Sequence, residues 1–213
     1  MTSSPPSAGL GFIHRFLPGA AGHIPLLLLH GTGGNEDDLI PLARRISPGS
    51  SLLSPRGKVL EMGMPRYFRR RSEGVFDLDD MMERTDELAD FVLRAQDAYG
   101  IGRPVAMGFS NGANIAYSLL FRHPELLAGA ILFRAVLPFE PETLPALDIP
   151  VLLTLGSDDP MISPQQAPRL GAALARTGAR LTERTLAAGH GLTPEDIALA
   201  ETWMKKRAGE FGA

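Results

Sequence analysis

The sequence predicts an α/β fold in which a mostly parallel central sheet carries helices on both faces. Short apolar runs alternate along the chain with longer stretches in which apolar residues recur at helical spacing. The run at residues 26–29 consists of four leucines, as expected for a parallel strand that is covered on both faces. Glycine-marked turns follow four of the apolar runs, and in such sheets sites lie at the carboxyl ends of the strands.

The composition indicates one globular domain. The chain has 213 residues, of which 44% are apolar, and a domain of this size buries about 70% of its unfolded surface. We expect residues 1–9, which are rich in serine and proline, to form a loose tail, and residues 10–213 to form a single domain. The formal net charge is −3 with acidic and basic residues interspersed, which gives no electrostatic reason to expect a nucleic-acid partner.

Several features favour a cytoplasmic protein without a membrane span. The chain contains no cysteine, which is compatible with a reducing compartment. Its start lacks the basic residues and apolar core of a secretory signal, and the apolar run at residues 26–29 is far too short to cross a bilayer. No two histidines lie at helical distance, so we expect no metal site. We also expect no cofactor. A homodimer is compatible with the sequence, but no pattern specifies one.

The first half of the chain predicts three strands and two helices. The expected strands are residues 12–17 at the sheet edge, 26–29 and 51–54. The first helix has a buried stripe of Leu39, Leu42, Ala43 and Ile46, and Asn35 is the expected cap. Residues 55–76 form a long connection rich in methionine, arginine and aromatics, and the second helix covers residues 78–99 and ends at Gly100.

The second half continues the alternation. The expected strands are residues 104–109, a segment within 127–136, residues 151–155 and residues 180–186. The expected helices are residues 111–122, about 164–176 and 194–207. Residues 138–150 contain four prolines and show neither period, so they are predicted to be a loop.

The pentapeptide Gly108-Phe109-Ser110-Asn111-Gly112 joins the strand at 104–109 to the helix at 111–122. A serine with glycine two positions before and two after it can be held on a very sharp turn, because only glycine leaves room for the backbone to double back. Its hydroxyl then stands exposed at the carboxyl edge of the sheet. A helix cap or an ordinary tight turn is the alternative. We interpret Ser110 as a catalytic nucleophile.

A serine hydroxyl is a poor nucleophile until a neighbouring base takes its proton, which a neutral imidazole can do. Among five histidines, His190 is the best placed, because it follows the last predicted strand and lies between two glycines. Asp158 or Asp159, after the preceding strand, can accept the other imidazole proton and orient the ring. The order serine, acid, histidine along the chain is the one found in folds that carry the nucleophile on a sharp turn between a strand and a helix.

A reaction of this kind also needs hydrogen-bond donors for the developing oxyanion. The backbone amides of Thr32, in a turn with three glycines, and of Asn111, directly after Ser110, are the natural pair. We expect His30 to brace this turn rather than to act as the base.

Four motifs resemble those of the α/β-hydrolase superfamily and, within it, the phospholipase/carboxylesterase family. They are HGTGGNEDDL from His30, GFSNGANIA from Gly108, GSDDP from Gly156 and GHG from Gly189. The resemblance extends from about Pro25 to Trp203. In that family the acid directly precedes the proline, which selects Asp159. The segment from Ser54 through the run of arginines also looks like the branch of bacterial carboxylesterases of the hydroquinone-stress type.

The resemblance implies an α/β-hydrolase fold without a large cap domain. It implies a serine carboxylesterase that hydrolyses small-molecule esters through an acyl-enzyme intermediate. The lack of room for a cap domain between the strands predicts an open site and small to medium acyl chains. A thioesterase or lysophospholipase is the nearest alternative, because the same machinery serves any activated acyl group. The alternative of another class is a non-catalytic ligand-binding protein, although a binder has no physical need for nucleophile, base and acid together.

The connection at residues 55–76 offers two further candidate features. Its apolar side chains can form a substrate pocket or simply pack the loop on the core, with equal weight; they are Met62, Met64, Tyr67, Phe68 and Phe76. Its basic run is expected to be solvated or salt-bridged, with a clamp for an anionic substrate as the alternative; it contains Arg66, Arg69, Arg70 and Arg71.

Overall fold

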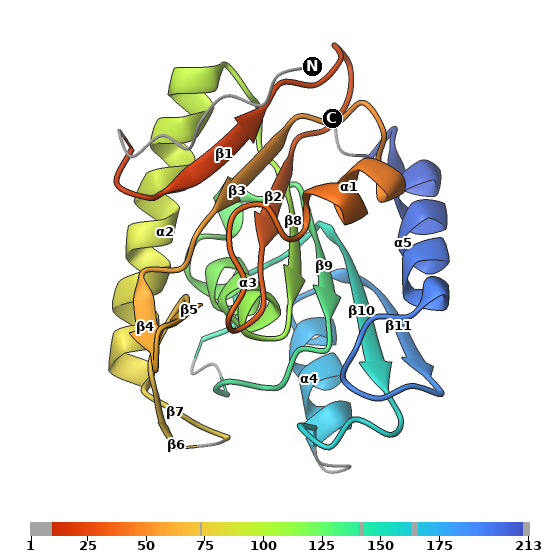
Figure 1. Ribbon diagram of the computed structural model, residues 1–213. Coiled ribbons are helices and arrows are strands. Elements are labelled where there is room, and N and C mark those ends of the chain that lie inside the picture. The colour runs from red at the N-terminus through yellow and green to blue at the C-terminus, as the bar shows by residue number, and fades with distance from the viewer. Residues whose placement is uncertain (1–9, 73, 141–142, 163–165, 211–213) are drawn as a thin grey trace.

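A seven-stranded sheet forms the centre of the protein in a computed structural model that describes residues 10–72, 74–140, 143–162 and 166–210 (Figure 1). In spatial order its strands are β1 (His14–Leu17), β3 (Leu52–Pro55), β2 (Leu26–Leu29), β8 (Val105–Phe109), β9 (Gly129–Phe133), β10 (Pro150–Gly156) and β11 (Arg180–Leu186). Only β1, at the edge, pairs with its neighbour in antiparallel fashion. The predicted fold class is confirmed. The expected tail, residues 1–9, lies outside the described residues, and the single domain over 10–213 stays a prediction.

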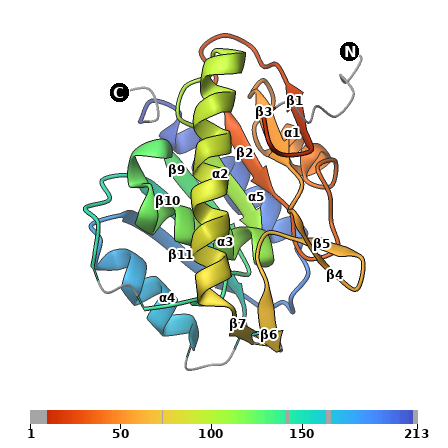
Figure 2. The same cartoon turned by 90° about the vertical axis from the view of Figure 1, so that its left-hand side faces the viewer.

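Helices cover both faces of this sheet. On one face lie α2 (Leu78–Tyr99), α3 (Asn111–Arg122) and α4 (Gln166–Ala175), and on the other lie α1 (Ile40–Ile46) and α5 (Pro194–Arg207). Figure 2 shows α2 and α3 in front of the sheet and α5 behind it. A short 3₁₀ helix, η1 (Pro124–Leu126), follows α3. Among the helices of the described residues, none is long and apolar enough to cross a membrane.

The two helical layers explain why β2 is apolar at every position. Leu27 and Leu29 belong to the core beneath α2 and α3, whereas Leu26 and Leu28 belong to the core beneath α1 and α5. Successive side chains of a strand point to opposite faces, so a strand between two cores has no solvent-facing position. All four leucines are fully buried.

The long helix α2 has both of its predicted ends. The Asp77 side chain accepts a hydrogen bond from the backbone amide of Asp80, and Gly100 ends the helix in the left-handed conformation at φ 61°. The start of α1 differs from the prediction. Its cap is Leu39, and the Asn35 side chain instead accepts a hydrogen bond from the amide of Asp37 at 2.8 Å, which stabilises the turn before the helix.

The connection at residues 55–76 contains structure that the sequence analysis did not predict. Two short hairpins occupy it: β4 (Val59–Glu61) with β5 (Met64–Arg66), and β6 (Arg70–Ser72) with β7 (Val75–Phe76). Strands of two or three residues are too short to show an alternating pattern. In the first hairpin Met62 and Gly63 both have positive φ, at 50° and 80°, as a two-residue turn of the primed type requires.

We predict that Phe91→Ala lowers the free energy of unfolding by about 3 to 5 kcal/mol, because a fully buried ring on α2 is removed and a cavity remains. Phe91 also lies 5.0 Å from the ring of Phe12, between centroids. Leu93→Ala on the same helix is the control, since Leu93 is 47% exposed and should change stability by about 0.5 kcal/mol at most. Urea unfolding measures both, and equal losses would contradict the assignment of the buried face.

Candidate active site

Ser110 occupies a strained turn between β8 and α3. Its backbone has φ 53° and ψ −115°, a combination that is unfavourable for a residue with a side chain. The turn is held from both sides, because the Ser110 amide donates to the carbonyl of Phe133 at 2.9 Å and its own carbonyl accepts from the amide of Asn114 at 3.0 Å. Strain that is held in this way is typical of functional positions.

The two glycines that flank Ser110 are required by close backbone contacts. A Cβ atom on Gly112 would lie 1.9 Å from the carbonyl oxygen of Leu29, and one on Gly108 would lie 2.5 Å from the carbonyl oxygen of Gly112. No side chain fits at either position, because the approaching atoms are backbone atoms. The start of α3 is therefore pressed directly against the end of β2.

Ser110, His190 and Asp159 form a continuous row of hydrogen bonds. The Nε2 atom of His190 lies 2.9 Å from the hydroxyl oxygen of Ser110, and its Nδ1 atom lies 2.8 Å from a carboxylate oxygen of Asp159. The other Asp159 oxygen accepts a hydrogen bond from the amide of Met161 at 2.9 Å. A carboxylate at Nδ1 favours the tautomer that leaves Nε2 free to accept a proton. Asp158 is exposed and does not join the row.

Close contact between two turns sets the acid beside the imidazole. The amide of Asp158 donates to the carbonyl of Ala188 at 3.0 Å, and the amide of Ser157 donates to the carbonyl of Leu186 at 2.8 Å. Gly156 makes this approach possible, because a Cβ atom there would lie 2.3 Å from the carbonyl oxygen of Ala188. The turn after β10 and the turn after β11 are thereby joined along their backbones.

A buried ion pair supports the turn that carries His190. The guanidinium of Arg134 contacts both oxygens of Asp196 at 2.7 Å, and neither side chain is exposed. The same guanidinium donates to the carbonyls of Gly189 at 3.0 Å and Gly191 at 3.2 Å, which lie on either side of His190. Arg134 positions this turn, although no sequence motif marks it as a functional residue. An arginine within the apolar segment 127–136 was the available signal.

Asp196 stays ionised in this network. Burial raises the pKa of Asp196, but hydrogen bonds from Arg134, Thr193 and Thr154 outweigh burial and lower it overall. Thr154 donates to one carboxylate oxygen at 2.7 Å, and the amide of Thr193 donates to the other at 2.8 Å. The Thr193 contacts also complete a capping box at the start of α5.

Thr32 and Asn111 line the same cavity as Ser110. Neither of their backbone amides donates a hydrogen bond to another described residue. Two unpaired amides beside a serine hydroxyl are the arrangement that stabilises an oxyanion.

His30 braces the turn that contains Thr32. Its Nδ1 atom donates to the carbonyl of Gly31 at 2.6 Å, and its Nε2 atom accepts from the amide of Gly57 at 3.0 Å. Burial lowers the pKa of His30, which favours the neutral ring that this acceptor role requires. The amide of Gly33 adds a bond to the carbonyl of Pro65 at 2.9 Å.

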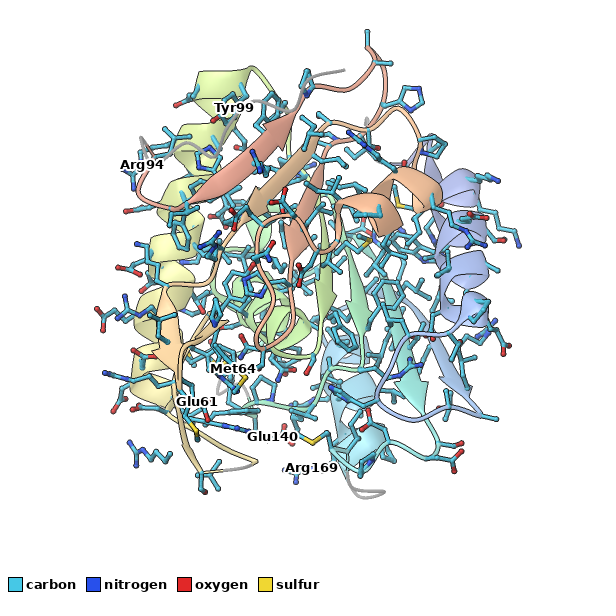
Figure 3. All side chains as sticks on the ribbon, viewed as in Figure 1. Glu61, Met64, Arg94, Tyr99, Glu140 and Arg169 are labelled. Atoms are coloured by element: carbon cyan, nitrogen blue, oxygen red, sulfur yellow. The ribbon has the colours of Figure 1, made fainter. Side chains whose placement is uncertain are left out.

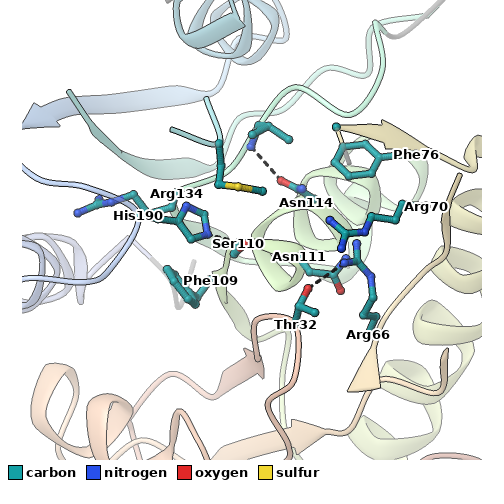
Figure 4. Close-up of a pocket in the computed structure, with 13 residues that line it drawn as sticks. Thr32, Arg66, Arg70, Phe76, Phe109, Ser110, Asn111, Asn114, Arg134 and His190 are labelled. Carbon is teal, nitrogen blue, oxygen red and sulfur yellow. Dashed lines mark hydrogen bonds between the residues drawn. The ribbon is translucent and has the colours of Figure 1, made fainter. Parts of the chain in front are cut away.

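A cavity of about 350 Å³ opens beside Ser110 (Figure 4). Among the five apolar side chains proposed for a pocket wall, Phe76 lines it. Tyr67 and Phe68 are 3% and 0% exposed and pack into the core, where the Tyr67 hydroxyl donates to the carbonyl of Pro55 at 2.8 Å. Met62 and Met64 are 91% and 40% exposed at the tip of the first hairpin, where Met64 lies opposite Glu61 (Figure 3).

The basic run divides into an inner and an outer pair. Arg66 and Arg70 line the cavity. Arg69 and Arg71 are 60% and 66% exposed and form ion pairs with Asp77, on the outside of the loop. In the part of the chain that the structure describes, no group of three or more acidic, histidine or cysteine side chains is placed to hold a metal.

The sequence and the fold of this chain are similar to those of known proteins. The sequence model of the Phospholipase/Carboxylesterase family matches residues 18–207. MhqD of Bacillus subtilis (strain 168), which is named as a hydrolase, is 43% identical over 196 residues that cover 91% of this chain and 98% of MhqD. A Bacillus cereus carboxylesterase of known structure is 42% identical with a TM-score of 0.87, covering 90% of this chain and 92% of that one. A Mesorhizobium loti carboxylesterase is 31% identical with a TM-score of 0.88, covering 96% and 99%.

We predict that Asp196→Asn lowers the free energy of unfolding at neutral pH by about 3 to 5 kcal/mol, because the buried guanidinium of Arg134 loses its counter-charge. The pKa of Asp196 is lowered on folding from an ordinary value of 3.8, so its stabilisation is present above that value and is lost as the pH falls through the lowered pKa. Urea unfolding between pH 2 and pH 8 should therefore give a flatter acid limb for the variant than for the wild type.

Asp158→Asn, which changes an exposed carboxylate nearby, is the control and should follow the wild-type curve. Parallel curves for Asp196→Asn and the wild type would contradict the role of the ion pair.

Proposed function

The chain belongs to the phospholipase/carboxylesterase family of α/β-hydrolases, and from this premise we propose that it is a serine carboxylesterase with the triad Ser110, His190 and Asp159. The chain is a serine hydrolase, because it belongs to this family and is similar to a carboxylesterase and a hydrolase over most of its length. The proposal for the residues rests on the row of hydrogen bonds, 2.9 Å from Ser110 to His190 and 2.8 Å from His190 to Asp159. Ester hydrolysis by this route uses all three groups: Ser110 as the nucleophile, His190 as the base and Asp159 to orient His190.

In the first half of the reaction the Ser110 hydroxyl oxygen attacks the ester carbonyl carbon while Nε2 of His190 takes its proton. The carbonyl oxygen becomes an oxyanion, which accepts hydrogen bonds from the amides of Thr32 and Asn111. Asp159 accepts a hydrogen bond from Nδ1–H of His190 and stabilises the imidazolium that forms. His190 then returns the proton to the alcohol oxygen, the ester bond breaks, and an acyl-serine remains.

In the second half water replaces the alcohol. His190 takes a proton from the water as it attacks the acyl-serine, and the same two amides hold the oxyanion a second time. The proton is returned to the Ser110 oxygen, the acid leaves, and the enzyme is restored. The strained turn at Ser110 supports this reading over a non-catalytic binding protein, because simple binding has no use for a serine held at φ 53°.

The volume of the cavity limits the size of the substrate. Its volume of about 350 Å³ lies near the lower end of the range for small-molecule sites. We propose esters with short to medium acyl chains as the substrates.

Ser110→Ala is expected to lower kcat at least about a thousandfold on p-nitrophenyl esters from acetate to long acyl chains, because the hydroxyl that forms the acyl-enzyme is removed. The wild type should turn over short and medium chains faster than long ones. Ser157→Ala, at an exposed serine after β10, is the matched control and should retain activity. Equal rates for wild type and Ser110→Ala, with both folded by circular dichroism, would remove Ser110 as the nucleophile.

Asp159→Asn should lower kcat by about 10³ to 10⁴-fold, because the amide no longer favours the reactive tautomer of His190 or stabilises its cation. Asp158→Asn makes the same chemical change one residue earlier on an exposed side chain, and its kcat should stay within about twofold of the wild type. Steady-state kinetics on one short ester compares the two. A larger loss in Asp158→Asn would assign the acid to the other position.

A further inference from the structure

One wall of the cavity beside Ser110 is cationic. Arg66, at the end of β5, and Arg70, at the start of β6, both line it, and Figure 4 shows their guanidinium groups across the cavity from His190. Among the described residues that line the cavity there is no aspartate or glutamate. The chain as a whole carries a formal net charge of −3, so this positive wall is a local feature.

The two guanidinium groups share one carboxylate. Nη1 of Arg66 lies 3.2 Å from Glu61, and Nε of Arg70 lies 2.9 Å from the same side chain. Within the described residues, neither arginine forms an ion pair with any other acid. The cation of Arg134, which also borders the cavity, is already matched by Asp196. Two positive charges against one negative charge leave the wall with about one uncompensated positive charge.

Arg66 is held rigidly in this wall. It is 4% exposed, its Nε donates to the carbonyl of Phe68 at 3.3 Å, and its Nη1 donates to the hydroxyl of Thr32 at 3.0 Å. Burial lowers the pKa of Arg66, the carboxylate of Glu61 raises it, and the nearby charge of Arg70 lowers it, so that the overall direction is downward. An arginine stays protonated in such surroundings, so the site bears the cost of a partly desolvated cation that an anion would relieve.

Arg70 has donors to spare. Its side chain is 24% exposed, and its Nε atom is the one that contacts Glu61. Its two terminal nitrogens make no hydrogen bond to another described residue. A guanidinium with free terminal nitrogens matches the two oxygens of a carboxylate in a paired contact.

Asn111 adds an unpaired donor to the same site. The residue is 3% exposed, and its side-chain oxygen accepts from the amide of Tyr67 at 2.8 Å, which leaves the amide nitrogen Nδ2 as the free end. That nitrogen is buried and has no hydrogen-bond partner among the described residues. A buried donor without a partner is costly, and this one belongs to a residue that lines the cavity.

We propose that the enzyme acts on esters that carry a second, free carboxylate, which Arg70 and Arg66 bind while Ser110 attacks the ester carbonyl. The inference rests on the proposed function, since it names the substrate class of the same site. The cavity of about 350 Å³ suits a half-ester of a small dicarboxylic acid. The cationic wall holds the substrate's carboxylate away from Ser110, on the side opposite His190 (Figure 4).

Matched esters test the preference. Monoethyl glutarate carries the free carboxylate, and the ethyl ester of glutaramic acid replaces it with a neutral amide of nearly the same shape. The wild type should show a kcat/KM at least about tenfold higher for the acid, because a charge-assisted contact is lost in the amide. A second pair, 3-(butanoyloxy)propanoate and its amide, carries the group on the alcohol half, and the pair with the larger ratio identifies which half faces the arginines.

Variants of one residue test the assignment. Arg70→Gln should reduce the acid-to-amide ratio to about one, whereas Arg70→Lys should keep part of it, because the charge remains without the paired geometry. Arg71→Gln is the matched control, since Arg71 is 66% exposed and does not line the cavity, and it should keep the wild-type ratio. No preference for the acid in either pair, or equal ratios in Arg70→Gln and Arg71→Gln, would overturn the proposal.

A binding measurement separates this inference from the esterase assignment. Calorimetry with glutarate and the folded Ser110→Ala protein should show binding that is lost when Arg70→Gln is added. If esters are hydrolysed in a Ser110-dependent way while glutarate does not bind and the acid is not preferred, the carboxylate site is wrong and the esterase stands. If no ester is hydrolysed but glutarate binds in an Arg70-dependent way, the carboxylate site stands and the esterase is wrong.

Discussion

The buried ion pair between Arg134 and Asp196 joins parts of the chain that are far apart in sequence. It links the end of β9, Thr154 in β10, the start of α5 and the turn around His190. Two charges without exposure to water are tolerated because both carboxylate oxygens of Asp196 have donors and the guanidinium of Arg134 has five acceptor atoms. The position of the imidazole therefore depends on a charge network, whereas apolar packing supports the rest of the sheet.

Local patterns were enough to predict the fold and the bounds of α2, because apolar periodicity indicates the extent of the helix and Gly100 marks its end. The strand, elbow and helix around Ser110 were predictable for a similar reason, since glycine spacing reports a contact that no side chain permits. Arg134 was not, because its partner Asp196 lies 62 residues further along the chain and nothing near either residue reveals the pairing. The two short hairpins also escaped prediction, since two or three residues carry no period.

In the connection at 55–76 the sequence gives the types of residue, but it does not indicate which side chains face the cavity. Its aromatic residues were equally compatible with a pocket wall and with packing on the core, and Tyr67 and Phe68 lie in the core. Packing of these neighbouring residues inward anchors the loop, and the arginines on either side of them, Arg66 and Arg70, are left to face the cavity. Sequence alone gives the residue types of such a loop, but which side chain faces which way follows from short strands that only the tertiary structure reveals.

The hydrogen bond from Arg66 to Thr32 connects the cationic wall to the turn beside the nucleophile. A ligand that draws on Arg66 also acts on that turn, so selectivity at this site is expressed in the turnover number as well as in affinity. A substitution of Arg66 that removes the positive charge would therefore also remove one of the contacts that hold this turn, alongside the hydrogen bonds of His30 and of the Gly33 amide.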